Sequence, residues 1–142
     1  MRNPAILYPM FALAAWTLVV LLLIPFARVR SARRREVVVD DFKYGESATV
    51  PPAVSIPNRN YMNLLELPML FYVVCIVLYL TAGSSTTTIA LAWAFVALRI
   101  GHSLIHLTYN RVVHRLAAFT AANVALVMLW VTAGVHVAAA AP

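Results

Sequence analysis

Apolar residues along the chain gather in four long runs, separated by polar segments of very different length. The runs cover residues 6–27, 67–83, 89–98 and 116–141, and the third continues with few interruptions toward His106. Because a membrane-spanning helix needs roughly 20 mostly apolar residues, this pattern predicts four transmembrane helices. We place these helices at about 5–27, 58–80, 87–109 and 112–138.

Four such helices use most of the 142 residues, so the sequence predicts an all-α fold. The expected architecture is an integral membrane four-helix bundle that forms a single domain over 1–142. The very short connection between the third and fourth helices makes them antiparallel neighbours. Residues 28–57 are polar and contain the helix-breaking sequences VPP and IP, which predicts a long loop. Within it, EVVVDDF is either a short extended piece or part of the loop.

The first apolar run is predicted to remain as a spanning helix and not to be removed as a signal peptide. Its apolar part is longer than the roughly 7–15 residues of a signal-peptide core. It also ends in ARVRSARRR, where a signal peptide would have a small-residue cleavage site.

Composition supports a membrane protein and gives its expected orientation. The chain is 63% hydrophobic and only 11% charged, whereas a soluble domain needs far more polar surface. Basic residues concentrate after the first helix, in the segment that holds Arg28, Arg30, Arg33, Arg34, Arg35 and Lys43. The positive-inside rule then places the first and third loops in the cytoplasm and both termini outside. The net charge of +6 indicates topology and contact with anionic head groups, and no nucleic-acid partner.

Polar residues at the start of the second helix share one face. Arg59, Asn63 and Glu66 lie within roughly 60° of one another on a helical projection. A carboxylate inside an apolar span is expensive unless it meets a cation or a solvated cavity. Glu66 therefore forms either a structural ion pair, with Arg99 or Arg115, or part of a binding site.

The third helix carries the densest polar pattern of the chain. Six side chains fall on roughly one third of its circumference: Arg99, His102, Ser103, His106, Tyr109 and Asn110. The opposite face is apolar. This stripe predicts a polar pocket that opens toward the cytoplasm.

Two arginines lie one turn apart where the fourth helix begins. Arg111 and Arg115 together suit an anionic ligand, although His114 and Arg115 could also extend to the membrane interface. His102 and His106 have the spacing of two metal ligands on a helix, but no third ligand is obvious and HExxH is absent, so we predict no metal site. A haem would need a second axial histidine at the right depth. The single cysteine, Cys75, is predicted to be a small buried apolar residue.

RNYMNLLELP on the second helix and RIGHSLIHLTYNRVVHR across the third and fourth resemble the MAPEG superfamily, the membrane-associated proteins of eicosanoid and glutathione metabolism. The similarity is to bacterial members and to the microsomal prostaglandin E synthase branch, and it covers nearly the whole chain. It implies a homotrimer in the lipid bilayer, in a bacterial inner membrane. It also implies that glutathione binds between subunits toward the cytoplasmic side.

Carried over by position, the resemblance assigns roles to individual residues. Glu66 would hold the amino group of glutathione, and Arg28 would reach the bound tripeptide from the end of the first helix. The other positions implied to bind it are Arg59, Asn63, Arg99, His102, Arg111 and Arg115, and His106 and Tyr109 belong to the same polar stripe. The chain departs from the family pattern at His106, Met62 and Phe119, which replace a tyrosine, an arginine and a tyrosine.

The resulting hypothesis is a membrane-bound glutathione transferase or peroxidase. Arg115, with Arg111 as second choice, would stabilise the glutathione thiolate, which attacks a lipophilic electrophile or hydroperoxide that enters from the bilayer. The alternative is a non-catalytic lipid-binding or scaffold member of the same fold, which the three departures favour. A haem or metal protein is the third possibility.

Overall fold

The computed structural model describes residues 2–140, and every regular element in this range is helical. A short 3-10 turn, η1 (Pro4–Leu7), leads into α1 (Tyr8–Arg33), and a second, η2 (Val39–Phe42), lies in the following loop. The remaining helices are α2 (Pro52–Leu65), α3 (Leu67–Leu80), α4 (Thr86–Leu107) and α5 (Val112–Ala139).

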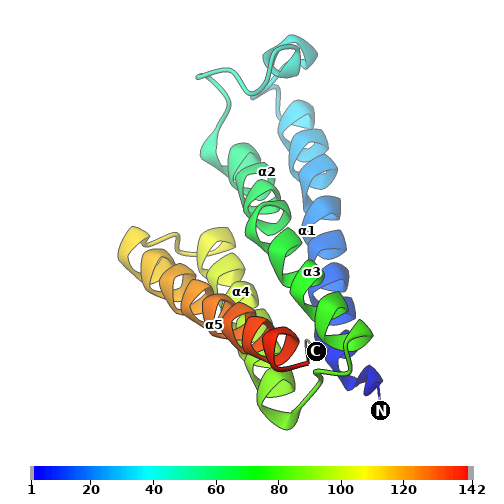
Figure 1. Ribbon diagram of the computed structural model, residues 1–142. Coiled ribbons are helices and arrows are strands. Elements are labelled where there is room, and N and C mark those ends of the chain that lie inside the picture. Colours follow the sequence, from blue (N-terminus) through cyan, green and yellow to red (C-terminus); the bar gives the residue numbers. More distant parts are fainter. Residues whose placement is uncertain (1, 141–142) are drawn as a thin grey trace.

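Four helical segments are long and apolar enough to cross a membrane, namely Pro4–Arg33, Pro52–Leu80, Thr86–Leu107 and Val112–Ala139. The prediction of an all-α, multi-pass membrane protein is therefore confirmed. Figure 1 shows the segments running up and down, with α4 and α5 as an antiparallel hairpin beside α1 and the α2–α3 pair. We call the end with the 34–51 loop and the α4–α5 turn the loop end, and the opposite end the terminal end.

Two helices extend into the segment predicted as a loop. α1 continues to Arg33 instead of ending near residue 27, and α2 begins at Pro52 instead of near Asn58. Pro52 is compatible with this start because the amide of a first-turn residue has no partner within the helix. The connection is thus confined to residues 34–51. EVVVDDF contains the 3-10 turn η2 and no strand.

This shorter loop is organised around Asp41. Its carboxylate accepts hydrogen bonds from the Val38 backbone N–H at 2.8 Å and from the Ser47 hydroxyl at 3.0 Å. These donors, the backbone N–H first, lower the pKa of the Asp41 carboxyl. Beneath the loop, Phe42 packs on a small buried cluster of Val37, Val50 and Val54, which joins the loop to the first turn of α2.

The second spanning segment is broken at its midpoint. Glu66 has φ −71° and ψ −87°, outside the helical region, and separates α2 from α3. Pro68 follows two residues later and has no amide to donate, so a continuous ladder of helical hydrogen bonds is interrupted here. The break leaves backbone carbonyl groups near the end of α2 available to side chains.

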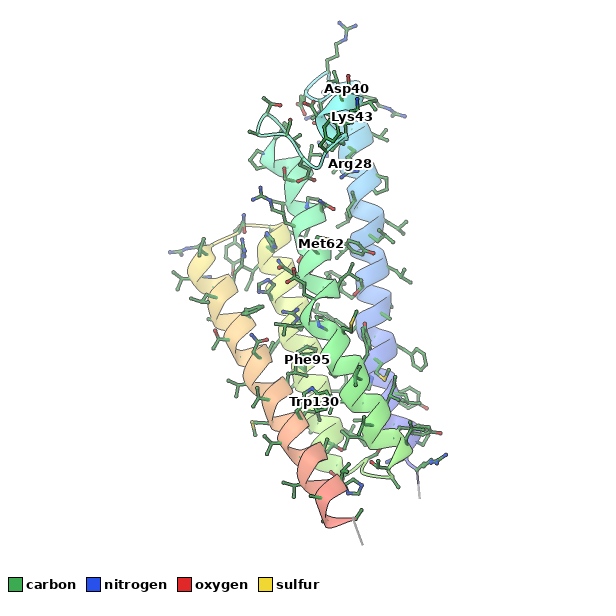
Figure 2. All side chains as sticks on the ribbon, turned by 45° about the horizontal axis from the view of Figure 1, so that its top comes forward. Arg28, Asp40, Lys43, Met62, Phe95 and Trp130 are labelled. Atoms are coloured by element: carbon green, nitrogen blue, oxygen red, sulfur yellow. The ribbon has the colours of Figure 1, made fainter. Side chains whose placement is uncertain are left out.

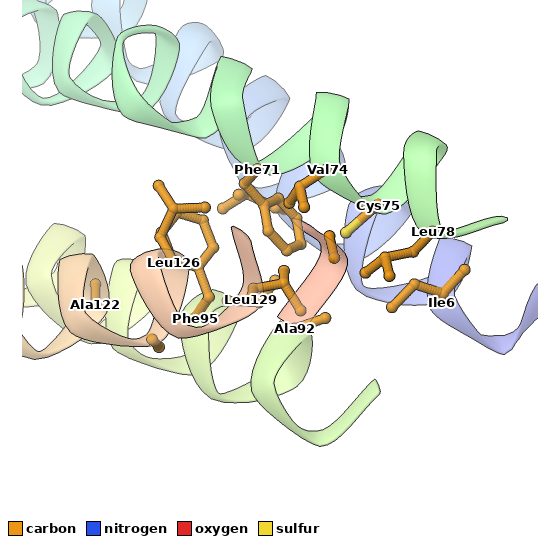
Figure 3. Packing of buried hydrophobic residues seen from close by; sticks show 14 of the residues in the cluster. Ile6, Phe71, Val74, Cys75, Leu78, Ala92, Phe95, Ala122, Leu126 and Leu129 are labelled. Carbon is orange, nitrogen blue, oxygen red and sulfur yellow. The ribbon is translucent and has the colours of Figure 1, made fainter. Parts of the chain in front are cut away.

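The apolar core fills the terminal half of the bundle, where α3, α4, α5 and the start of α1 meet (Figure 3). Phe71 of α3 and Phe95 of α4 stack with ring centroids 4.6 Å apart, and both side chains are fully buried. Ile6 and Leu13 close the cluster from the first segment. Cys75 is also fully buried there, in accord with its interpretation as an apolar core residue.

Replacing Phe95 by alanine should remove this stacked pair and leave a cavity that the surrounding helices cannot fill. We expect Phe95→Ala to lower the free energy of unfolding by about 3 kcal/mol, seen as a lower thermal midpoint in detergent. Phe11→Ala is the matched control because Phe11 is 67% exposed. Equal losses in the two variants would contradict a core centred on Phe71 and Phe95.

Candidate functional site

A cleft of about 380 Å³ opens at the loop end between α2 and the α4–α5 hairpin, which lean apart in this direction (Figure 1). We call it the polar cleft. It is lined by Ile56, Asn58, Arg59, Met62, Asn63, His106, Asn110 and Arg115. Four of the predicted site residues, Arg59, Asn63, His106 and Arg115, are therefore brought together, although they lie on three different helices.

Arg115 is fixed at the rim of the polar cleft by the turn that precedes α5. Its Nη1 donates a hydrogen bond to Asn110 Oδ1 at 2.7 Å. Asn110 adopts φ 49°, a left-handed conformation that asparagine tolerates better than most residues. The Nε of Arg115 is buried and has no hydrogen-bond partner among residues 2–140. Arg115 therefore keeps donor capacity for a ligand.

The two histidines of α4 lie against this arginine. His102 Nδ1 donates to the backbone carbonyl oxygen of Arg115 at 3.0 Å, because a carbonyl can only accept. That bond fixes the tautomer when the ring is neutral, so Nε2 is an acceptor. His106 is 3% exposed, and its Nδ1 has no partner within the described chain. The polar cleft thus offers ring nitrogens as well as guanidinium groups.

Arg99 is buried directly behind the polar cleft. Its side chain is 1% exposed, and Nη2 donates to the carbonyl oxygen of Asn63 at 2.6 Å. The break at Glu66 is what leaves this carbonyl free. The guanidinium carbon lies 5.8 Å from the Phe95 ring centroid and 5.5 Å from that of Phe119, within the range of cation–π attraction.

A second polar contact joins three helices beneath the polar cleft. Ser103 Oγ accepts hydrogen bonds from Trp16 Nε1 at 2.8 Å and from Asn60 Nδ2 at 2.7 Å. Ser103 lies on the predicted polar stripe, whereas the helical pattern does not point to Trp16 or Asn60. The requirement that a buried indole N–H finds an acceptor was the only available signal for Trp16. These bonds set the positions of α1 and α2 against α4.

The polar stripe of α4 is shorter than predicted. The helix ends at Leu107, so Tyr109 and Asn110 lie in the turn and not on the helix face with Arg99. Tyr109 is 55% exposed, and its hydroxyl lies 3.1 Å from His114 Nδ1, on the outside of the hairpin. The reason is the turn itself, because the chain must reverse between α4 and α5 and uses the left-handed conformation of Asn110 to do so.

Three further predicted residues do not line the polar cleft of the single chain. Arg111 is exposed at the N-terminal boundary of α5. Glu66 is exposed at the helix break, and among residues 2–140 it forms no ion pair within 4.0 Å with Arg99 or Arg115. Of the two alternatives for Glu66, the direct ion pair with Arg99 or Arg115 is therefore not formed in the single chain, where the side chain is exposed at the helix break.

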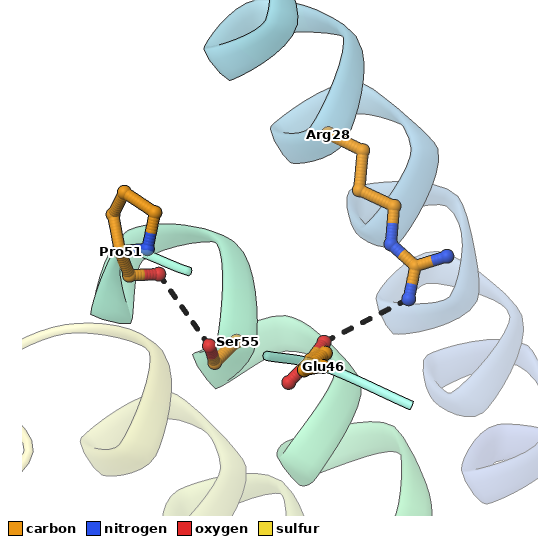
Figure 4. Close-up of polar contacts among 4 residues, drawn as sticks. All are labelled: Arg28, Glu46, Pro51 and Ser55. Carbon is orange, nitrogen blue, oxygen red and sulfur yellow. Dashed lines mark hydrogen bonds and ion pairs between the residues drawn. The ribbon is translucent and has the colours of Figure 1, made fainter. Parts of the chain in front are cut away.

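Arg28 is engaged elsewhere at the loop end. Its Nη2 lies 3.7 Å from Oε1 of Glu46 (Figure 4). Its guanidinium carbon stands 4.4 Å above the ring of Phe42. Figure 2 shows Arg28 beside Lys43 and Asp40 of the loop, with Met62 farther along α2. Arg28 is consequently held by its own loop in this structure.

Over residues 2–140 the structure contains no group of three or more histidine, cysteine, aspartate or glutamate side chains that could hold a metal ion. His102 and His106 lie with ring centroids 6.1 Å apart in an edge-to-face arrangement. The polar side chains that line the polar cleft are guanidinium, amide and imidazole groups.

Four spanning helices with a cationic cleft at one end define a multi-pass membrane protein that can receive an anionic ligand. The chain matches the model of the MAPEG family over residues 6–135, and it belongs to that family. Members of this family generally use glutathione. Comparison with curated proteins and with solved structures gave no match.

Removing the shared acceptor of the three-helix contact should destabilise the bundle. Ser103→Ala leaves the N–H groups of Trp16 and Asn60 buried without a partner, which we expect to cost about 2 kcal/mol in the free energy of unfolding. Ser84→Ala, at a half-buried hydroxyl with one long contact of 3.4 Å, is the control. Thermal unfolding in detergent measures both. A Ser103→Ala midpoint equal to the control would contradict the role of this contact.

Proposed function

We propose that the protein is a membrane-bound glutathione-dependent transferase or peroxidase and that the polar cleft binds glutathione. The observation that carries this proposal is a cationic cleft whose buried nitrogen atoms lack partners. Arg115 Nε and His106 Nδ1 are both buried without a hydrogen bond inside the described chain. Buried polar nitrogen atoms are normally satisfied, so these two unpartnered atoms on residues that line the cleft support a ligand that would complete them.

The donor set of the polar cleft fits the charges of the tripeptide. Glutathione has two carboxylates, one ammonium group and one thiol. Arg59 and Arg115 supply positive charge, and bidentate guanidinium pairing suits a carboxylate. Asn58 and Asn63 add amides that can both donate and accept. The missing element within one chain is an acid for the ammonium group.

Glu66 is the acid that this site needs, and its exposure supports the proposed homotrimer. It lies at the break between α2 and α3, directly before the apolar run 67–83, yet its side chain is exposed on the single chain. An uncovered carboxylate at this depth would be costly in lipid. A neighbouring subunit that covers Glu66 removes this cost, and it would bring the acid of one chain toward the cleft of another.

In the proposed reaction, Arg115 stabilises the thiolate of glutathione. A free thiol has a pKa near 8.5, and each unit of lowering corresponds to about 1.4 kcal/mol of preferential stabilisation of the thiolate. The thiolate then attacks a lipophilic electrophile or a hydroperoxide that enters from the bilayer. Arg111 is the second candidate, and its exposure next to the α4–α5 turn leaves it free to reach the same ligand.

The alternative is a non-catalytic lipid-binding or scaffold member of the family. Phe119 is the residue that favours it, because it presents a ring face to Arg99 and has no hydroxyl to offer a ligand. Ultraviolet absorbance separates the two functions, since addition of glutathione to the solubilised protein gives a thiolate band only if the site ionises the thiol.

We also propose that the loop end of the protein faces the cytoplasm of a bacterial inner membrane.

Arg115→Ala should abolish the thiolate band and lower glutathione conjugation by roughly 10²-fold, the usual effect of losing one preorganised donor. Because Arg115 also bonds Asn110, the unfolding midpoint and oligomeric size must be measured in parallel. Arg35→Ala, which removes a loop arginine outside the polar cleft, is the control. Unchanged conjugation in a folded Arg115→Ala protein would exclude the assignment.

Releasing Arg28 from its loop should strengthen glutathione binding if this arginine reaches the ligand. Glu46→Gln removes the carboxylate that pairs with Arg28, so we expect the Kd for glutathione to fall about two- to fivefold. Asp40→Asn removes the same charge from the same loop without touching that pair and should leave the Kd unchanged. An equal gain in both variants would show a general charge effect, and no gain would remove Arg28 from the site.

A further inference from the structure

A second cleft, of about 370 Å³, lies on the other side of α2 and shares no residue with the polar cleft. It is bounded by the last turns of α1, the first turns of α2 and the end of α4. Its inner wall is apolar and its rim carries Arg30 and Arg34. We call it the basic cleft.

The α1 side of the basic cleft is a single stripe. Leu23, Phe26 and Arg30, and the C-cap residue Arg34, follow one another at intervals of three or four residues, so they share one face of the helix, with Ala27 beside Phe26. The apolar members come first and the arginines last. Phe26, one helical turn before Arg30, is 65% exposed. The stripe therefore passes from apolar to cationic along the direction in which α1 leaves the membrane.

The walls of the basic cleft opposite α1 are apolar. Val54 and Pro57 of α2 and Leu107 of α4 line the basic cleft without adding any charge. An occupant must therefore have an apolar part along the helices and an anionic part at the loop end. A soluble anion satisfies only the second condition.

The charges at the rim indicate which anion fits. Both oxygens of the Glu36 carboxylate are already engaged, one by the Ser31 hydroxyl and the other by Arg34 Nη1 at 4.0 Å. Arg30 has no acidic side chain within 4.0 Å in residues 2–140. Two guanidinium groups against one carboxylate leave one net positive charge, which matches the single negative charge of a phosphodiester.

We propose that the basic cleft binds an anionic phospholipid, with the phosphodiester on Arg30 and Arg34 and an acyl chain along Leu23 and Phe26. Basic recesses between spanning helices are known to select anionic lipid head groups. The proposal needs only the membrane insertion of the helices and does not depend on glutathione binding. A result that excludes glutathione turnover therefore leaves the lipid proposal standing, and a result that excludes lipid binding leaves the glutathione proposal standing.

The test uses the full-length protein in a neutral detergent, with unfolding midpoints measured over a titration of phosphatidylglycerol. Binding to the folded state raises the midpoint in proportion to occupancy, which gives an apparent Kd. We expect phosphatidylglycerol to raise the midpoint, and phosphatidylcholine and inorganic phosphate to leave it unchanged. An equal rise with inorganic phosphate would overturn the lipid assignment in favour of a simple anion site.

Paired charge variants test the location. Arg30→Gln with Arg34→Gln should weaken phosphatidylglycerol binding by roughly fivefold for each arginine removed. Arg33→Gln with Arg35→Gln removes the same charge from positions that do not line the basic cleft and should change the Kd little. Equal weakening in the two double variants would overturn the proposal, because it would show a diffuse surface potential.

A steric variant keeps the test independent of the arginines. Ala53→Phe fills the basic cleft from the exposed first turn of α2 without altering charge, and it should abolish the preference for phosphatidylglycerol. Retained preference in a folded Ala53→Phe protein would overturn the proposal. A change in oligomeric size in this variant would also overturn it, since the cleft would then be covered by a second copy of the chain.

Discussion

Polar groups buried inside an apolar bundle depend on partners within the protein, and the Asn63 carbonyl is the one hydrogen-bond acceptor that Arg99 has among residues 2–140, since its Nε and Nη1 are buried without a partner there. A fully buried guanidinium in a membrane segment is expensive unless acceptors and aromatic faces surround it. The broken helix at Glu66 supplies the acceptor, and Phe95 and Phe119 supply the rings. The path of α2 and α3 and the position of α4 are thus tied to a single side chain.

The two halves of the bundle consequently differ in the kind of side chain that fills the space between the helices. At the terminal end, apolar side chains pack densely around Phe71 and Phe95 and hold the helices together. Toward the loop end, α2 and the α4–α5 hairpin lean apart, and polar side chains line the space between them. The contact of Ser103 with Trp16 and Asn60 lies between the halves, so the apolar core fixes the geometry of the polar cleft.

Two charged residues of the predicted site do not line the polar cleft of the single chain. Glu66 is exposed at the break between α2 and α3, and Arg28 is paired with Glu46 of its own loop. Both observations have the same explanation under the proposed function, because a site between subunits would take its acid and part of its cations from different chains. The two clefts on opposite sides of α2 would then separate a soluble ligand from a lipid, since one is lined by polar groups and the other has an apolar wall.

Hydrophobic pattern determined the four spanning helices and the polar face of Arg99, His102, Ser103 and His106, and the short connection between the last two helices determined their hairpin. These features follow from local periodicity and from the length of a bilayer crossing. Only the tertiary structure decided that Tyr109 leaves that face, that Glu66 is exposed at a helix break and that Arg28 pairs with Glu46. Each depends on backbone geometry at a turn, a helix break or a loop, where one dihedral angle redirects a side chain that periodicity would place elsewhere.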